Sequence, residues 1–313
     1  MIESTEHKHF PWFTTLFSLL LLCVYVVMAI LSGSIEVAPK YLEYFGAPYA
    51  TQIYSGHVYG VITNNLIHIN LLHLLANLVG LWLFGAFIER RIGWVKMAAF
   101  GLVSSIFGSM IQLTLTDDAG LGISSALFGF YVLILIMSFR DERFKMKYMY
   151  VFGIALFFLL IFMIVNNQLF GEEIAIEAKI GGVFWGFLMG ISQRESTIRW
   201  QLLLLFGLPF SIAASTLFYA PWSSQWQCTK GIAYHKKHEL NTAKKYYQAA
   251  IHIDPSNHLA QENYKLVQID QLAILAYDAH LSGEYTTARR YYLKILSIKK
   301  NHRWALDNLK ELP

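Results

Sequence analysis

The sequence predicts an all-α protein, in which a polytopic bundle of membrane-spanning helices is followed by a soluble helical domain. Of its 313 residues, 55% are hydrophobic and only 15% are charged, which is too apolar for an ordinary soluble protein. Seven apolar runs approach or exceed the roughly 20 residues that cross a bilayer, and amphipathic helices follow from residue 223. We expect a tail at 1–10, a membrane core at 11–195, a seventh span at 196–222 and a soluble domain at 223–313.

The order of the apolar runs and the charges between them predict the topology. The runs lie at 11–32, 66–87, 94–115, 121–139, 149–167, 179–192 and 201–220. The first is longer than the apolar part of a secretory signal, so we expect it to span. Basic residues gather after the second, fourth and sixth runs, whereas the alternate connections hold only Lys40. Positive loops remain on the inner side, so the N-terminus is expected inside and the C-terminal domain outside.

The net charge and the cysteines exclude several classes of protein. The charge of +4 arises in the tail, because residues 221–313 carry 13 basic against 8 acidic side chains. This modest positive charge permits contact with the lipid bilayer, but it does not indicate a protein that binds nucleic acid. Two cysteines cannot form a disulfide framework. The histidines lack carboxylates or cysteines at ligand spacing, so we expect neither a metal nor another cofactor.

A small serine segment lies at the start of the fourth run. It reads Gly122-Ile123-Ser124-Ser125-Ala126-Leu127-Phe128-Gly129, and its small residues allow helices to approach closely in lipid. In the second run, Asn70, His73 and Asn77 are spaced to share one helical face. Polar groups at this depth are costly unless they point into the protein. One interpretation is that these side chains only join helices through hydrogen bonds. We favour the other, in which His73, Asn77 and the Ser124 amide stabilise an oxyanion on a carbonyl that Ser124 attacks.

The sixth run combines a lysine with a ridge of glycines. Gly182, Gly186 and Gly190 recur every four residues, which gives a smooth face for close helix contact. Lys179 precedes Gly182 by three residues and therefore lies near the same face.

These motifs together resemble the rhomboid family of intramembrane serine proteases over roughly residues 55–195. The matching residues are His68, His73, Asn77, Gly85, Glu89, Arg90, Arg91, Gly93, Gly122, Ser124, Phe128, Ala178, Gly182 and Gly186. The resemblance implies a six-helix core that cleaves transmembrane protein clients, with Ser124 as nucleophile. It also implies that Phe128 lies beside the base, that Asn70, Gly122 and Ser125 line the site, and that Glu89 and Arg91 are structural.

The sequence departs from the family pattern at three places. Lys179 occupies the position of the histidine base, Ser125 replaces a glycine and is expected to hinder contact between the fourth and sixth helices, and Tyr59-Gly60 replaces a Trp-Arg pair. A serine–lysine dyad requires a neutral amine, yet Glu172, Glu173 and Glu177 lie just upstream and would hold Lys179 charged. The alternative is that Lys179 extends to the outer interface or pairs with a glutamate. Three hypotheses stay open: a protease with a Ser124–Lys179 dyad, a proteolytically inactive rhomboid that binds clients, and a membrane anchor for an external adaptor.

The tail resembles tetratricopeptide repeats. Gly231, Tyr234, Ala243, Tyr247, Ala250 and Pro255 fall at that spacing. A second unit surrounds Ala288 and Tyr292, and the 45 residues between the two alanines predict a long helix near 258–281. Such hairpins imply a groove for a peptide or protein partner. Together with the rhomboid resemblance, the topology predicts an integral protein of the bacterial plasma (inner) membrane.

Overall fold

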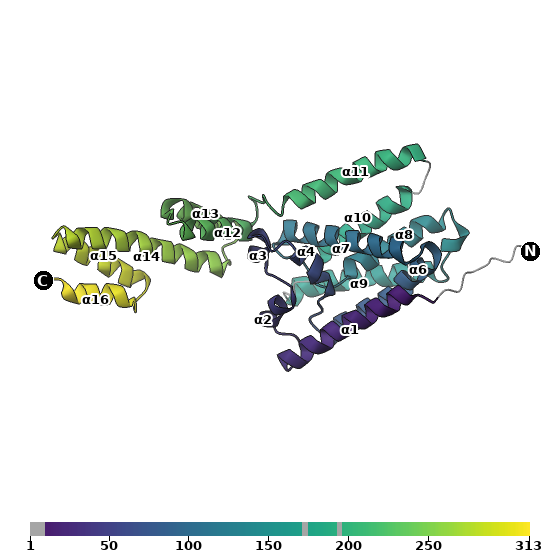
Figure 1. Cartoon of the computed structure of the whole chain (residues 1–313), viewed down its shortest axis with the longest axis horizontal. Helices are drawn as coiled ribbons and strands as arrows, with labels where there is room; N and C mark the ends of the chain where they lie inside the picture. The colour runs from purple at the N-terminus through teal and green to yellow at the C-terminus, as the bar shows by residue number, and fades with distance from the viewer. Residues whose placement is uncertain (1–9, 171–174, 193–195) are drawn as a thin grey trace, which may run out of the picture. The chain divides into compact units, whose positions relative to one another are not determined.

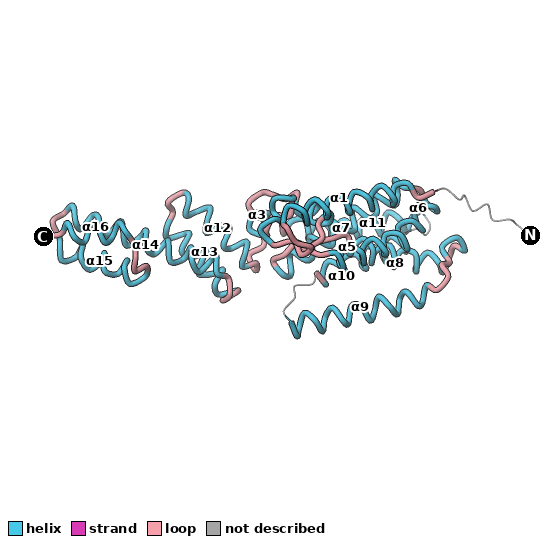
Figure 2. Tube along the Cα trace, turned by 90° about the horizontal axis from the view of Figure 1, so that it is seen from below, coloured by secondary structure: helices cyan, strands magenta, loops and turns pink. Residues whose placement is uncertain are grey.

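The computed structural model describes residues 10–170, 175–192 and 196–313. Within these ranges the chain forms helices and loops and has no β-strand (Figures 1 and 2), which confirms the all-α fold class. The chain divides into two compact units, Met1–Tyr219 and Ala220–Pro313.

The first unit contains the apolar helices. They are α1 (Trp12–Ser32), α5 (Leu71–Gly80), α6 (Ala86–Ile92), α7 (Trp94–Thr116), α8 (Ser124–Ser138), α9 (Met149–Phe170), α10 (Ile176–Ser192) and α11 (Ser196–Ser215). Shorter helices α2 (Pro39–Leu42), α3 (Ala50–Tyr54) and α4 (Gly60–Thr63) lie between α1 and α5. Within the described residues, three stretches are long and apolar enough to cross a membrane, namely Trp12–Ser32, Leu71–Ile92 and Trp94–Thr116. The chain is therefore an integral membrane protein.

The helix of the second apolar run begins at Leu71, later than the predicted residue 66. Asn70 has an extended backbone, and its side chain accepts a hydrogen bond from the His73 N–H at 2.8 Å, so it caps α5. The prediction that Asn70 shares a helical face with His73 and Asn77 is therefore wrong. The helix continues through a π-helical turn, Leu81–Gly85, into α6. The helix of the seventh run also ends earlier than predicted, because α11 ends at Ser215 and not at residue 220.

Helices α8 and α10 pack backbone against backbone. A Cβ atom on Gly182 would overlap the Ser125 carbonyl oxygen, and one on Gly186 would overlap that of Gly129. The predicted hindrance by Ser125 does not occur, because its side chain turns to α7. There a Cβ on Gly108 would lie 2.7 Å from the Cβ of Ser125. The glycines therefore hold α10 directly against the helix that carries Ser124.

Glu89 and Arg91, both on α6, form hydrogen bonds to segments that are distant in sequence. The Glu89 carboxylate accepts hydrogen bonds from the N–H groups of Phe13 and Thr14 at 2.9 and 2.8 Å, and from the Thr14 hydroxyl at 2.7 Å. Arg91 donates to the carbonyl oxygens of Phe87 and Arg143. Glu89 therefore caps the first turn of α1, whose N–H groups lack partners within the helix.

We expect Glu89→Ala to lower the free energy of unfolding by about 2 kcal/mol, because three charge-assisted hydrogen bonds and a favourable helix-dipole contact are lost. Thermal unfolding in detergent measures the change. Glu142→Ala is the control, since that side chain is 83% exposed. Equal stabilities of the two variants would contradict the capping role.

The second unit consists of helix hairpins. Its helices are α12 (Ser224–Lys236), α13 (Leu240–Ile253), α14 (His258–Leu281), α15 (Tyr285–Ile298) and α16 (Arg303–Glu311). The long helix predicted near 258–281 is α14. A Cβ on Gly231 would lie 2.5 Å from the Tyr247 ring, so a glycine is needed where α12 meets α13. Burial raises the pKa of the Cys228 thiol to about 11, which keeps this thiol protonated near neutral pH.

The hairpin core repeats along the unit. Ala243, Tyr247 and Ala250 are completely buried in the first part, and Ala288, Tyr292 and Ile295 in the second. Each tyrosine hydroxyl lies within hydrogen-bond distance of a histidine ring. The Tyr247 hydroxyl is 3.4 Å from the His235 Nδ1, and the Tyr292 hydroxyl is 3.1 Å from the His280 Nδ1. Tyr234 stacks on Tyr246 and packs against the core of the first part, and Pro255 follows the end of α13.

Candidate functional site

Two side chains of α5 converge on the loop that precedes α8. His73 and Asn77 are four residues apart and therefore lie on one helical face. A Cβ atom on Gly122 would lie 2.9 Å from the His73 Nε2 and 3.1 Å from the Asn77 Nδ2. The Asn77 Nδ2 is buried, and among the described residues it has no hydrogen-bond partner. An unpaired buried donor is costly, so it is available for an acceptor that enters the site.

The same loop positions Ser124. Gly122 has φ +80°, a conformation that favours glycine, and its N–H donates to the Asn64 carbonyl oxygen at 3.0 Å. Two residues later Ser124 opens α8, with Ile123 as the N-cap. Its backbone N–H belongs to the first turn, where amides have no acceptor within the helix and carry partial positive charge. Only 9% of Ser124 is exposed, so the hydroxyl lies in a largely enclosed position.

Lys179 is buried near the start of α10, with 4% of its surface exposed. Its Nζ donates a hydrogen bond to the Ala175 carbonyl oxygen at 2.9 Å. Across the described ranges, no hydrogen bond joins Lys179 to Ser124 and no cation–π contact joins it to Phe128. Phe128 itself is 6% exposed and lies one turn beyond Ser124 on α8. Lys179 therefore lies on α10, the helix that packs against α8, but its amine points along α10 and not to Ser124. Glu172 and Glu173 lie outside the described residues.

Two polar residues near the site, Gln112 and Asn64, were not singled out from the sequence, and His68 was named only as part of the matching motif. The Gln112 Oε1 on α7 accepts from the Ala178 N–H at 3.0 Å, which fixes the start of α10 beside Lys179. Asn64 holds Gly122, as described above. His68 is completely buried, its ring lies 4.9 Å from that of His73, and neither ring nitrogen has a partner in the described part of the chain. A glutamine within an apolar run was the available sequence signal for Gln112.

Fold and site together define a helical membrane protein with a serine at the start of a buried helix, opposite two side chains from a neighbouring span. Residues 55–195 match the family described as Rhomboid domain. This match confirms the resemblance over the stretch that carries the polar motifs. It supports the assignment of this stretch to the rhomboid family.

Individual relatives show the same similarity. RHOMBOID-like protein 7 of Arabidopsis thaliana is 31% identical over 158 residues, 48% of this chain and 47% of that protein. Rhomboid protease GluP of Bacillus subtilis (strain 168) is 26% identical over 283 residues, 89% of this chain and 53% of that protein. Rhomboid protease GlpG of Haemophilus influenzae is 29% identical over 187 residues, 56% of this chain and 90% of that protein. The chain spans about half the length of the first two relatives.

Proposed function

We propose that the protein is an intramembrane serine endopeptidase of the rhomboid type that cleaves transmembrane protein clients, with Ser124 as the nucleophile. The observation that carries this proposal is the convergence of His73 and Asn77 on Gly122, two residues before Ser124. Preorganised donors at this place suit a tetrahedral oxyanion, which is a large contribution to catalysis by serine hydrolases. The relatives named as rhomboid proteases support the same class of reaction.

In the proposed reaction the Ser124 Oγ attacks the carbonyl carbon of a client peptide bond. Lys179, as a neutral amine, takes the hydroxyl proton and passes it to the leaving amine as the C–N bond breaks. The negative charge on the carbonyl oxygen is stabilised by Asn77, His73 and the Ser124 N–H. Water then hydrolyses the ester on Ser124 and restores the free serine.

The packing of α10 supports Lys179 as the base. Lys179 lies one turn before Gly182, and Gly182 contacts the backbone of Ser125. In the proposed mechanism, rotation about the side-chain torsions of Lys179 separates its amine from the Ala175 carbonyl oxygen and turns it toward α8. Catalysis therefore requires this hydrogen bond to exchange for one with the Ser124 hydroxyl when a client binds.

A second candidate function is client binding without cleavage. The hydrogen bond from the Lys179 Nζ to the Ala175 oxygen favours it, because an amine held there does not activate Ser124. In this case the serine loop and the donors of α5 form only the wall of a binding groove for transmembrane segments.

Variants at Lys179 distinguish the two candidates. We expect a fluorophosphonate probe to label the native protein at Ser124 and Lys179→Ala to slow labelling by about 10²-fold or more, the usual contribution of a general base. Labelling rates are followed by mass spectrometry, with Lys96→Ala as an exposed-lysine control. An unreactive native protein together with a reactive Lys179→His variant would show that the second candidate is correct.

For the tail we propose a tetratricopeptide-like unit that recruits a peptide or protein partner. The buried small residues between α12 and α13 and their repetition around Tyr292 support this proposal. Removal of residues 223–313 is expected to reduce client cleavage while probe labelling of Ser124 is retained. Loss of labelling in the truncated protein would contradict a separate recruiting role.

The proposed topology places the N-terminus in the cytoplasm and the tail outside the plasma (inner) membrane of a bacterium. Arg91 and Arg143 lie together at the end of the unit expected to face the cytoplasm. Alkaline phosphatase is active only outside, so we expect a fusion after Pro313 to be active and one after Arg143 to be inactive. The reverse pattern would contradict this orientation.

A further inference from the structure

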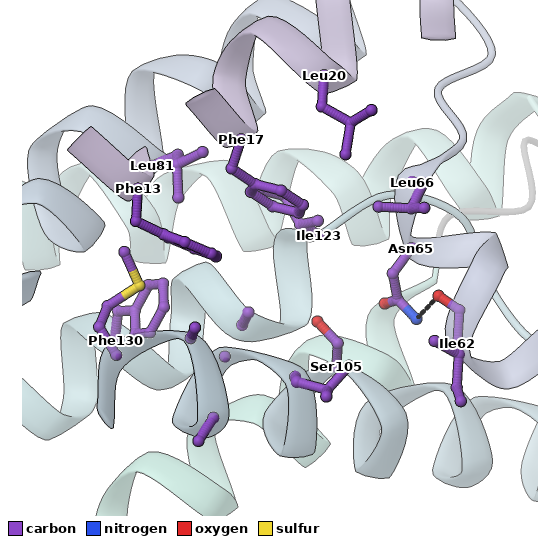
Figure 3. Close-up of a pocket in the computed structure, with 16 residues that line it drawn as sticks. Phe13, Phe17, Leu20, Ile62, Asn65, Leu66, Leu81, Ser105, Ile123 and Phe130 are labelled. Carbon is purple, nitrogen blue, oxygen red and sulfur yellow. Dashed lines mark hydrogen bonds between the residues drawn. The ribbon is translucent and has the colours of Figure 1, made fainter. Parts of the chain in front are cut away.

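An apolar cavity opens between α1, α7 and α8, away from the face of α8 that packs on α10. Its volume is about 410 Å³. Figure 3 shows Phe13, Phe17 and Leu20 of α1 along one side of it and Ile123 at the start of α8. Leu20 and Leu102 line the cavity and are 47% and 52% exposed, so the cavity opens on the exposed surface of the helix bundle between α1 and α7.

The polar side chains in this cavity are few, and the Asn65 amide nitrogen already has acceptors. It donates to the carbonyl oxygens of Val61 and Ile62 and to the Ser109 hydroxyl. Figure 3 shows the bond to Ile62. The lining from α1 forms a stripe, because Phe13, Phe17 and Leu20 follow one helical face over about 10 Å at 1.5 Å per residue. The shape and chemistry suit an extended hydrocarbon chain that enters from the membrane.

A second cavity, of about 630 Å³, shares one lining residue, Phe13, with the first. The Phe13 ring stacks on Trp94 at 6.0 Å. Trp12 and Trp94 border this cavity and are 65% and 58% exposed. Tryptophans in such positions are typical of the level of lipid headgroups, so the pair of cavities runs from headgroup level into the apolar region.

The second cavity contains an available cation. Arg90 lines it, is exposed, and makes no ion pair or hydrogen bond with any residue in the described ranges. The neighbouring Glu89 carboxylate points to the first turn of α1, where the amide donors offset its charge. Arginine binds phosphate oxygens through two parallel hydrogen bonds, and the cytoplasmic leaflet is rich in anionic lipids.

We propose that this pair of cavities is a binding site for one anionic phospholipid. Its phosphodiester lies at Arg90 between Trp12 and Trp94, and one acyl chain passes Phe13 into the cavity between α1 and α7. The chain then ends near Ile123 and Ala126, the residues on either side of the Ser124–Ser125 pair. The site does not depend on proteolytic activity.

The test uses the full protein in phosphatidylcholine nanodiscs. Trace phosphatidylglycerol or phosphatidylcholine carries the same photoactivatable acyl chain, and cross-linked peptides are mapped by mass spectrometry. We expect cross-links on the segments 13–20 and 97–105, with phosphatidylglycerol favoured about fivefold, the effect of one arginine near an anionic surface. Arg90→Gln should abolish this preference, and the exposed Lys96→Gln should keep it.

A second pair of variants tests the chain site independently of charge. Ala98→Phe places a ring in the first cavity and should lower cross-linking of both lipids, whereas Val95→Phe, on the exposed side of α7, should not. Equal labelling by the two lipids in the native protein would overturn the proposal. So would labelling unchanged by Ala98→Phe, or cross-links that map to a second copy of the chain.

Discussion

Replacing Ser124 with alanine is expected to lower the rate of client cleavage by about 10⁴-fold or more, as for nucleophile loss in other serine hydrolases. The reason is local, because the Ser124 Oγ is the only atom lost, while Gly122 still holds the loop against His73 and Asn77. The measurement is cleavage of a transmembrane client in liposomes by the purified native and variant proteins.

Ser125→Ala is the matched control for this prediction. Ser125 adjoins Ser124 and is buried, but its side chain faces Gly108 on α7, so its loss should leave cleavage within a few-fold of the native rate. Full cleavage by the Ser124→Ala variant would contradict the assignment of the nucleophile.

Replacing Gly182 with alanine is expected to lower the free energy of unfolding by about 3 kcal/mol, at the upper end of overpacking costs. The added Cβ would overlap the Ser125 carbonyl oxygen, and neither backbone can move without separating α8 from α10. Separation also moves Lys179 away from Ser124, so the variant should lose probe labelling. Thermal unfolding in detergent and the labelling rate measure the two effects.

Gly207→Ala on α11 is the control for Gly182→Ala. A Cβ atom at Gly207 would meet nothing within 4 Å, so its stability should equal or slightly exceed that of the native protein, since alanine is the better helix former. If both variants unfold at the same temperature, the backbone contact between α8 and α10 does not carry the stability assigned to it.

Much of the fold could be predicted because lipid imposes strong composition rules. A run of about 20 apolar residues has few alternatives to a helix, and glycines at four-residue spacing predicted the contact that Gly182 and Gly186 make with α8. The position of α14 followed from the distance between Ala243 and Ala288. These features depend on residues close in sequence or on a repeated pattern.

The parts that could not be predicted depend on contacts between distant segments. Hydrophobicity does not show that Asn70 leaves the helix to cap it. The accommodation of Ser125 depends on Gly108, which lies on another helix. Lys179 is the clearest case, because its position on α10 follows from the sequence, whereas the acceptor of its amine depends on side-chain torsions that no pattern encodes.

Activation of Ser124 by Lys179 is the feature that separates a protease from a protein that only binds clients. Its most direct test is intact-mass measurement of the purified protein after reaction with a fluorophosphonate. We expect one phosphonate adduct, located at Ser124 by peptide mapping and much slower to form in Lys179→Ala. A folded native protein that gains no adduct across the pH range would contradict it.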